Sequence, residues 1–316
     1  MTMRRSSQRS SKSGGAEPAA AGSARIPGRS SVLARLEPHL FYLPALVIYA
    51  LFMVVPVAGT VGLSLVHWDG WGAPSFAGLA NYVAAFRDPL FWQALWHNLV
   101  LIPYYVVLPL AIGLVLAAVI EQLKLRGTGF FRFTLFLPYI MPGVLVGVVW
   151  RWLLNPVFGL VNEVLALFGV AGPAWLGDFK LALPTVGLIG AWAGYGFCFV
   201  VFLAGIQKIP AELYEAAHID GASAVGEFWH VTVPGLRGEM VVVLVANMIN
   251  ALRAFDVIWA TTRGGPGRQT TVIASYMVEN AFNINRVGYG AALAVILAVV
   301  TIALSTATLR LLGERK

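Results

Sequence analysis

Four polar side chains interrupt an apolar stretch in the last third of the sequence: Asn247, Asn250, Arg253 and Asp256. Their regular spacing predicts that they lie along one side of a helix. Amide and ionisable groups at membrane depth usually face a helix bundle or a watery cavity, and they often mark a pathway. We therefore interpret these residues as candidates for the lining of a substrate pathway.

Each of these four residues also has a structural interpretation. Asn247 and Asn250 are explained equally well as hydrogen-bonding groups that join helices. For Arg253 and Asp256 an ion pair is the favoured interpretation, because residues three apart on a helix are neighbours and the pair neutralises two charges.

Aromatic side chains of the preceding apolar stretch could complete such a pathway. Recognition of a hydroxyl-rich molecule uses amide or carboxylate hydrogen bonds together with an aromatic face. Tyr195 and Trp192 could supply that face, although packing is the simpler explanation for both. No nucleophile and base can be assembled from the sequence, and His218 and His230 lack a clustered third metal ligand. We expect neither a catalytic centre nor a metal site.

The longest polar segment between two apolar stretches is Ile209–Pro234, with the sequence IPAELYEAAHIDGASAVGEFWHVTVP. Pro210 and Glu212 are typical of the first turn of a helix. A narrow apolar face follows, made of Leu213, Ala216 and Ala217. We expect this helix, which lies outside the membrane, to dock into another protein.

The second half of this segment predicts a hinge and a second short helix. Asp220 and Gly221 are expected to break the first helix. Asp220 is then expected to cap the second helix by accepting from the N–H of Ser223, and Pro234 is expected to limit that helix.

The composition identifies a membrane protein. Of 316 residues, 58% are hydrophobic and only 12% are charged, about half of what a soluble domain carries. The net charge of +7 comes from the tail and the loops rather than one face, which excludes a nucleic-acid interface. The single cysteine, Cys198, is expected to pack in an apolar core. Residues 1–37 are predicted to form a disordered basic tail before a membrane domain over residues 38–316.

Six apolar stretches are long enough to cross a bilayer, which requires about 20 residues. They are Leu40–Val66, Asn98–Ile120, Arg132–Leu154, Leu183–Ile206, Gly238–Ala260 and Gly288–Leu312. Two pairs of small residues, Gly143/Gly147 and Gly190/Gly194, predict close packing between helices of the same chain.

Lysine and arginine predict the orientation, because they concentrate in cytoplasmic loops. With six spans, both termini share one side with the second and fourth loops. That side carries most of the basic residues: Arg4, Arg5, Arg9, Lys12, Arg25, Arg29, Arg35, Lys124, Arg126, Arg132, Lys208, Arg237, Arg310, Arg315 and Lys316. The termini and the loop at about residues 207–237 are therefore predicted to be cytoplasmic.

The letters of this loop resemble a known motif. Glu215-Ala216-Ala217, Asp220-Gly221-Ala222, Phe228 and Pro234 resemble the EAA motif of permease subunits in binding-protein-dependent ABC importers. The match also lies in the loop before the penultimate span, where the family has it.

Other segments resemble the carbohydrate-uptake group of that family. Gly78-Leu79-Ala80-Asn81-Tyr82 is similar to its external element after the first span. Phe255-Asp256, Gly264-Gly265-Pro266 and Thr270 are similar to its signature after the fifth span. The resemblance runs from about Leu40 to the C-terminus. Within the group, the chain resembles the first of the two paired permeases for maltose, glycerol 3-phosphate and related solutes. The extra N-terminal spans and large external domain of the maltose-type member are missing, so its specificity is not transferred.

The resemblance implies an all-α, polytopic membrane protein with six transmembrane helices in the type I importer permease fold, located in the cell (inner) membrane of a bacterium or archaeon. The resemblance implies that this chain is one of two homologous permeases in an importer. The importer would also contain two cytoplasmic ATPases and an extracytoplasmic binding protein, and it would import a sugar or polyol by alternating access. No Gly-x-x-x-x-Gly-Lys-Ser/Thr phosphate loop occurs in the sequence, so ATP and Mg²⁺ are expected to be used by the partners.

The resemblance also implies roles for the loop residues. Glu215 corresponds to the motif glutamate and is interpreted as a contact to an ATPase, with a solvated helix face as the alternative. Asp220 and Gly221 are interpreted as cap and hinge.

Three other functions remain as alternatives. An ion-gradient-driven secondary transporter would usually show an internal repeat, and none is clear. An importer permease for a non-sugar solute is a nearer alternative, which the Phe255-Asp256 and Gly-Gly-Pro elements disfavour. A membrane-embedded enzyme has little support.

Overall fold

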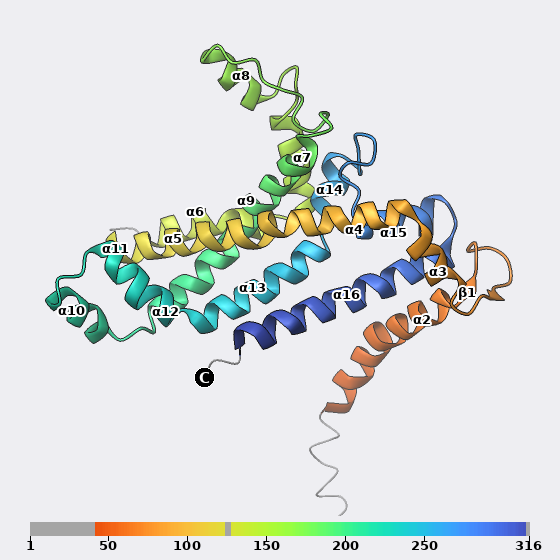
Figure 1. Ribbon diagram of the computed structural model, residues 1–316, viewed down its shortest axis with the longest axis horizontal. Helices are drawn as coiled ribbons and strands as arrows, with labels where there is room; N and C mark the ends of the chain where they lie inside the picture. Colours follow the sequence, from red (N-terminus) through yellow and green to blue (C-terminus); the bar gives the residue numbers. More distant parts are fainter. Residues whose placement is uncertain (1–41, 124–127, 314–316) are drawn as a thin grey trace, which may run out of the picture. The chain divides into compact units, whose positions relative to one another are not determined.

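The computed structural model describes residues 42–123 and 128–313 (Figure 1). The predicted tail over residues 1–37 lies outside these described residues. The chain divides into two units, Met1–Val55 and Pro56–Lys316. In the described part of the first unit, residues 42–49 are α-helical and the π-helix η1 (Ala50–Val54) follows.

Among the described residues, five helical stretches are long and apolar enough to cross a membrane: Tyr42–Ser64, Pro89–Gln122, Ala182–Ile206, Arg237–Thr261 (with an interruption at 253–255) and Val287–Leu312. A sixth candidate is a helix pair, Gly129–Ile140 and Gly143–Leu153, with a bend of 95°. The six-span prediction therefore holds when the bent pair is counted as one span.

The bent pair corresponds to the predicted span over Arg132–Leu154. Pro142 has an extended backbone with a ψ of 135°, and it separates α6 (Thr128–Ile140) from α7 (Gly143–Leu153). Proline lacks the N–H that would continue the helix and its ring clashes with the preceding turn, which explains why the helix ends here.

The boundary between the units falls at the first residue of α2 (Val55–Ser64). An antiparallel pair of two-residue strands follows, β1 (Val66–His67) and β2 (Ser75–Phe76). After α3 (Ala80–Arg87), one long helix is built from α4 (Pro89–Ile102), the π-helix η2 (Pro103–Val107) and α5 (Leu108–Leu123). This helix begins at Pro89 rather than at the predicted Asn98. The N–H of Leu90 is capped by Asp88, and Pro89 suits a first helical position.

The short helix α8 (Leu160–Leu167) lies between α7 and α9 (Ala182–Ile206). Helix α9 contacts α4, α5, α6, α7, α13 and α14, so it forms the centre of the helix assembly in the second unit. Its small residues permit close approaches, since an added Cβ at Gly190 would meet the ring of Tyr105. Cys198 is fully buried in this core, which confirms its predicted packing role.

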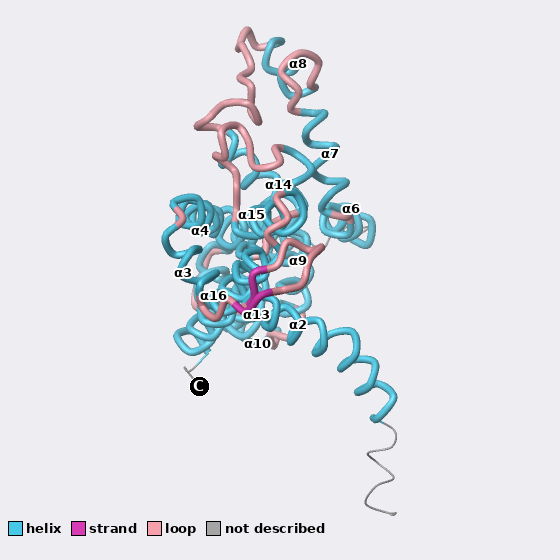
Figure 2. Tube along the Cα trace, turned by 90° about the vertical axis from the view of Figure 1, so that its right-hand side faces the viewer, coloured by secondary structure: helices cyan, strands magenta, loops and turns pink. Residues whose placement is uncertain are grey.

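Seven helical segments follow α9 along the chain. These are α10 (Ala211–Ile219), α11 (Ala224–Glu227), the π-helix η3 (Phe228–Thr232), α12 (Val233–Gly235), α13 (Arg237–Leu252), α14 (Asp256–Thr261) and α15 (Ile273–Val278). The π-helix η4 (Glu279–Asn283) and α16 (Val287–Gly313) follow. Helices α13 and α16 pack side by side (Figures 1 and 2).

The predicted small-residue pairs pack within the chain. An added Cβ at Gly143 would lie 2.8 Å from the Cβ of Asp256, and one at Gly147 would lie 2.5 Å from the Cβ of Ala260. Helix α7 therefore packs closely on α14, as the spacing of its glycines predicted.

Candidate functional site

The predicted fifth span is broken where its polar residues lie. Helix α13 ends at Leu252, Arg253 is its capping residue, and α14 begins only at Asp256. Phe255, between them, has φ −142° and ψ −58°, which is not helical. The expectation that the four polar residues follow one side of a continuous helix is therefore wrong.

Three of the four polar residues meet at a cavity of about 550 Å³ beside this break. Asn250, Arg253 and Asp256 line it and are exposed. Tyr105 from η2 lines the same cavity, together with apolar side chains of α15 and α16. The cavity thus combines an amide, a guanidinium, a carboxylate and an aromatic ring, which is the set of groups that binds a polar, hydroxyl-rich molecule.

The remaining residues predicted for the pathway lie elsewhere. Asn247 is 3% exposed, and its Nδ2 donates to the Sγ of Cys198 at 3.2 Å, a contact that joins α13 to α9. Trp192 packs edge-on against Trp150 at a centroid distance of 5.4 Å. Tyr195 is half-buried and does not line the cavity. Two aromatic residues do line it, Phe255 and Tyr105, and sequence reasoning missed Tyr105.

The favoured ion pair between Arg253 and Asp256 is not formed. Among the described residues, ion pairs join Arg132 to Glu121, Lys208 to Glu239 and Arg268 to Glu279, and His218 contacts Glu227. The break explains the difference, because two residues on opposite sides of a non-helical segment no longer have helical i, i+3 geometry.

Asn98, a residue that sequence reasoning did not single out, forms hydrogen bonds with the end of α13 at the break. Asn98 of α4 is fully buried, and its Nδ2 donates to the carbonyl oxygens of Ala251 and Leu252 at 3.2 and 3.1 Å. Its Oδ1 accepts from the N–H of Ile273 at 3.0 Å, where α15 begins. The available signal was an amide within a strongly apolar stretch, which implies a buried partner.

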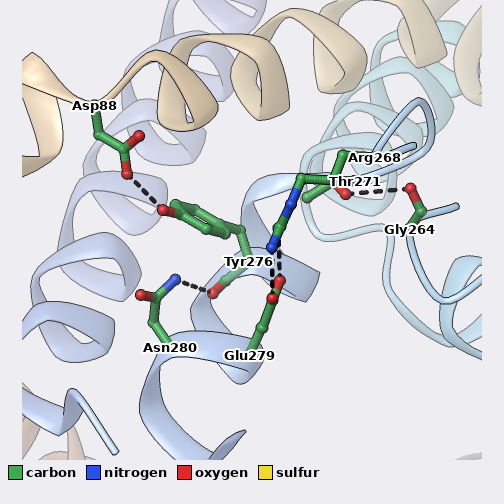
Figure 3. Close-up of polar contacts among 7 residues, drawn as sticks. All are labelled: Asp88, Gly264, Arg268, Thr271, Tyr276, Glu279 and Asn280. Atoms are coloured by element: carbon green, nitrogen blue, oxygen red, sulfur yellow. Dashed lines mark hydrogen bonds and ion pairs between the residues drawn. The ribbon is translucent and has the colours of Figure 1, made fainter. Parts of the chain in front are cut away.

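The Gly-Gly-Pro loop between α14 and α15 is fixed by side chains. Arg268 donates two hydrogen bonds to the carboxylate of Glu279, at 2.9 and 2.8 Å, and Thr271 donates to the carbonyl of Gly264 at 3.3 Å (Figure 3). Glu279 also raises the pKa of Arg268 through these hydrogen bonds. The positive φ of Gly264, +89°, explains why glycine is suited to this position.

A second polar group anchors α4 to α15 and α16. The Oδ2 of Asp88 accepts from the hydroxyls of Tyr276 at 2.5 Å and Tyr289 at 2.8 Å; the first of these bonds is drawn in Figure 3. Burial raises the pKa of Asp88, but the hydrogen bonds from Tyr276, Tyr289 and the N–H of Leu90 outweigh it, so the pKa lies below its ordinary value. The carboxylate is therefore ionised at neutral pH.

The loop with the predicted docking helix has the opposite character. Every residue of α10 is at least partly exposed; Leu213 is 52% exposed and Ile219 is 86% exposed. Ala216 is exposed and Ala217 is half-buried. Two contacts hold the helix, from the hydroxyl of Tyr214 to that of Thr232 at 3.0 Å and from His218 to Glu227 at 3.5 Å.

The hinge of this loop forms with a different cap from the one expected. Asp220 closes α10, and Gly221 follows with a φ of +79°. The N–H of Ala222 donates to the carbonyl of Ala217 at 2.9 Å, which is a Schellman ending. Helix α11 is instead capped by Ser223, whose Oγ accepts from the N–H of Gly226 at 3.3 Å. Asp220 is still helical and so cannot serve as the N-cap.

Pro234 does not end the second helix, which corrects the prediction. The chain stays helical through η3 and α12 to Gly235. The N–H of Val233 bonds to the carbonyl of Phe228, one residue further back than in an α-helix. This wider turn precedes the proline and accommodates its missing N–H. Phe228 packs in the turn against Trp229 at 5.1 Å.

A cavity of about 470 Å³ separates α10 from the ends of α5 and α9. Glu215 lines it, together with Glu121, Tyr214 and Glu227. A side-chain hydrogen bond also lies at this end of the bundle. The Nε2 of Gln207, in the predicted fourth loop, donates to the Oε2 of Glu121, near the end of α5, at 3.4 Å. Among the described residues, the end of α5 and the start of the predicted fourth loop thus lie at the same end of the helices, as the span count requires.

Comparisons with known proteins fit this arrangement. Residues 31–316 match the family described as binding-protein-dependent transport system inner membrane component. The sulfoquinovosyl glycerol transport permease SmoG of Agrobacterium fabrum is 34% identical, over 89% of this chain and 92% of that protein. The trehalose/maltose transport permease MalF of Thermococcus litoralis is 33% identical, over 86% of this chain and 92% of that protein.

The fold has a counterpart among solved structures. A chain of a bacterial ABC transporter that imports the acidic polysaccharide alginate superposes with a TM-score of 0.77 at 22% identity. The match covers 90% of this chain and 99% of that chain. The fold is therefore that of an ABC importer permease.

Proposed function

Because this chain belongs to the family of inner membrane components of binding-protein-dependent transport systems, we propose that it forms half of the translocation pathway for a carbohydrate or polyol. The observation that carries this proposal is the cavity at the helix break, where Asn250, Arg253, Asp256 and Tyr105 converge. The names of both relatives specify sugar-containing substrates, which supports the same class here.

The cavity suits such a substrate in its chemistry. Asn250 and Asp256 offer acceptors for hydroxyl groups, Arg253 offers donors, and Tyr105 offers a ring face. All four line a space of about 550 Å³, which is within the usual range for small-molecule sites. Broken helices at membrane depth expose backbone and polar groups where they line such a cavity.

The driving force is proposed to come from partner proteins. The sequence contains no phosphate loop, so two cytoplasmic ATPase subunits would bind ATP and Mg²⁺, and this chain would be non-catalytic. A second homologous permease would complete the pathway, and an extracytoplasmic binding protein would deliver the substrate. The described helices support a multi-pass membrane protein, and both termini are proposed to be cytoplasmic because of the distribution of basic residues.

The loop around α10 is proposed to receive the motion of an ATPase. Its proposed contact residues are Glu215, Ala216, Ala217, Asp220, Gly221, Phe228 and Pro234. The exposure of α10 supports docking to another protein, since exposed apolar patches mark interaction sites. The Schellman ending at Gly221 gives the helix a defined end, so that it can move as one piece.

The test uses the complete importer reconstituted in vesicles. ATP hydrolysis is expected to rise when loaded binding protein is added, and a panel of sugars and polyols is screened for uptake. This chain alone should hydrolyse no ATP and should not transport on an ion gradient. Equal stimulation by empty and loaded binding protein would contradict the coupling, and gradient-driven uptake by the chain alone would favour a secondary transporter.

A further inference from the structure

We propose that Asn98 is a positioning residue for the pathway, which keeps α13 broken after Leu252 so that Arg253 and Asp256 both reach the cavity. Asn98 touches neither residue and acts through the backbone of α13. The inference rests on the proposed function only in treating this cavity as the pathway.

The local sequence does not explain the break. The non-helical segment is Arg253-Ala254-Phe255, which contains neither glycine nor proline. Alanine and arginine are among the best helix formers. A helix with this sequence would be expected to continue through Asp256, so the interruption must come from tertiary contacts.

Asn98 occupies the two acceptors that a continuous helix would need. In a continuous α-helix, the carbonyl of Ala251 accepts from the N–H of Phe255, and that of Leu252 accepts from the N–H of Asp256. Here both carbonyls accept from the Nδ2 of Asn98, at 3.2 and 3.1 Å. The amide therefore replaces the helical hydrogen bonds at the position where α13 ends.

The carbonyl oxygen of the Asn98 side chain fixes the start of α15, a helix that lines the cavity. The Oδ1 of Asn98 accepts from Ile273, at the first residue of α15. The neighbouring His97 contacts the carbonyl of Thr271 through Nδ1, at 2.8 Å. One turn of α4 thus holds both the end of α13 and the start of α15, and α15 contributes Ala274 and Met277 to the cavity lining.

The test compares two conformations by cysteine reactivity. In the broken form, positions 253 and 256 are exposed, while Ala254 and Val257 border the cavity with only 5% and 8% of their surface exposed. In a continuous helix each residue turns by about 100°, so positions 254 and 257 would share the face of Asn250, and position 256 would turn away. The native Cys198 is fully buried and does not interfere.

Single cysteines replace Asp256 or Val257 in the assembled importer, with Asn98 intact or changed to Leu or Asp. A small, water-soluble maleimide is the probe. In Asn98→Leu, reactivity is expected to fall at position 256 and rise at 257, changing their ratio about tenfold. Asn98→Asp retains the acceptor for Ile273 and loses both donors, so it is expected to give the same shift.

The matched control is Asn81, a buried amide at 4% exposure that also donates to two carbonyls, those of Ser64 and Val66, both at 2.9 Å. Asn81→Leu is expected to leave the 256 to 257 ratio unchanged. An unchanged ratio in either Asn98 variant would overturn the proposal, as would an equal change in Asn81→Leu. Should Asn98→Leu fail to assemble, Asn98→Asp decides alone.

The same experiment separates this inference from the proposed function. The cysteine pattern reports the helix break whether or not a sugar is transported. A shifted pattern without any sugar or polyol uptake by the unmodified importer would retain the role of Asn98 and reject the substrate class.

Discussion

The helix break beside α4 and the loop around α10 use polar residues in opposite ways. At the break, the amide of Asn98 is fully buried and each of its polar atoms has a partner in the same chain. On α10, Glu212 and Glu215 are exposed, and so are the apolar Leu213 and Ile219. One region satisfies its own polar groups, whereas the other presents mixed groups outward.

The difference follows from the surroundings of each region. Within a bilayer no water is available for unsatisfied backbone groups, so a broken helix needs internal hydrogen-bond partners. A loop in water has no such requirement and can leave its surface for another protein. Substitutions at the break should therefore alter the pathway, whereas substitutions on α10 should alter coupling and leave the pathway intact.

The largest expected effect is at the cavity. Replacing Asp256 by Ala removes a charged hydrogen-bonding group, and uptake is expected to fall about 100-fold. Asn247→Ala is the control, because its amide faces Cys198 outside the cavity, and uptake should change by less than about threefold. Uptake is measured with radiolabelled substrate at equal amounts of assembled protein. An equal fall in both variants would remove the distinction between lining and packing residues.

On the loop, Glu215→Lys should reduce ATPase stimulation about tenfold, because it reverses a charge at the proposed partner surface. Glu212→Lys makes the same change one turn earlier, at an exposed position that does not line the loop cavity, and should have less effect. Stimulation is measured with loaded binding protein, and copurification with the ATPase is scored in parallel. Identical results for the two variants would indicate a solvated helix face without a specific contact.

The hinge should give a smaller effect. Gly221 has a φ of +79°, where a side chain costs about 1–2 kcal/mol, so Gly221→Ala should reduce stimulated ATP hydrolysis about fivefold. Gly226→Ala is the same substitution within α11, where an added Cβ meets only ordinary contacts at 3.5 Å or more. Its stimulation should be unchanged. If both variants showed the same stimulated ATP hydrolysis, coupling would not depend on the backbone conformation of Gly221.

The smallest expected effect is on stability, at Asp88. The pKa of Asp88 is lowered in the folded protein, so the ionised carboxylate stabilises the fold above its ordinary pKa, and this stabilisation is lost as pH falls through the lowered value. Asp88→Asn should cost about 1–2 kcal/mol at neutral pH, measured by thermal unfolding in detergent. The wild-type protein should show no change from this group between neutral pH and mildly acidic pH. A large loss of stability there would point to other titrating groups.

Part of this arrangement could be predicted from the sequence. Hydropathy located the apolar stretches, and the polar segment before the fifth span located the loop around α10. Both features could be predicted because each depends only on residues that are close together in the sequence. The bend after Ile140 was accessible too, since Pro142 lies within the predicted span. The end of α10 at Asp220 and Gly221 was also indicated, although the cap of the next helix was assigned to the wrong residue.

By itself, the sequence determined the composition of a membrane protein, the approximate spans and the positions of its polar residues. Only the tertiary structure decided that Asn250, Arg253 and Asp256 meet at a break and line one cavity with Tyr105. The break depends on Asn98, which is 153 positions away from Ala251 in the chain. Periodicity describes residues within one element, whereas a helix ends here because a distant amide takes its carbonyl groups.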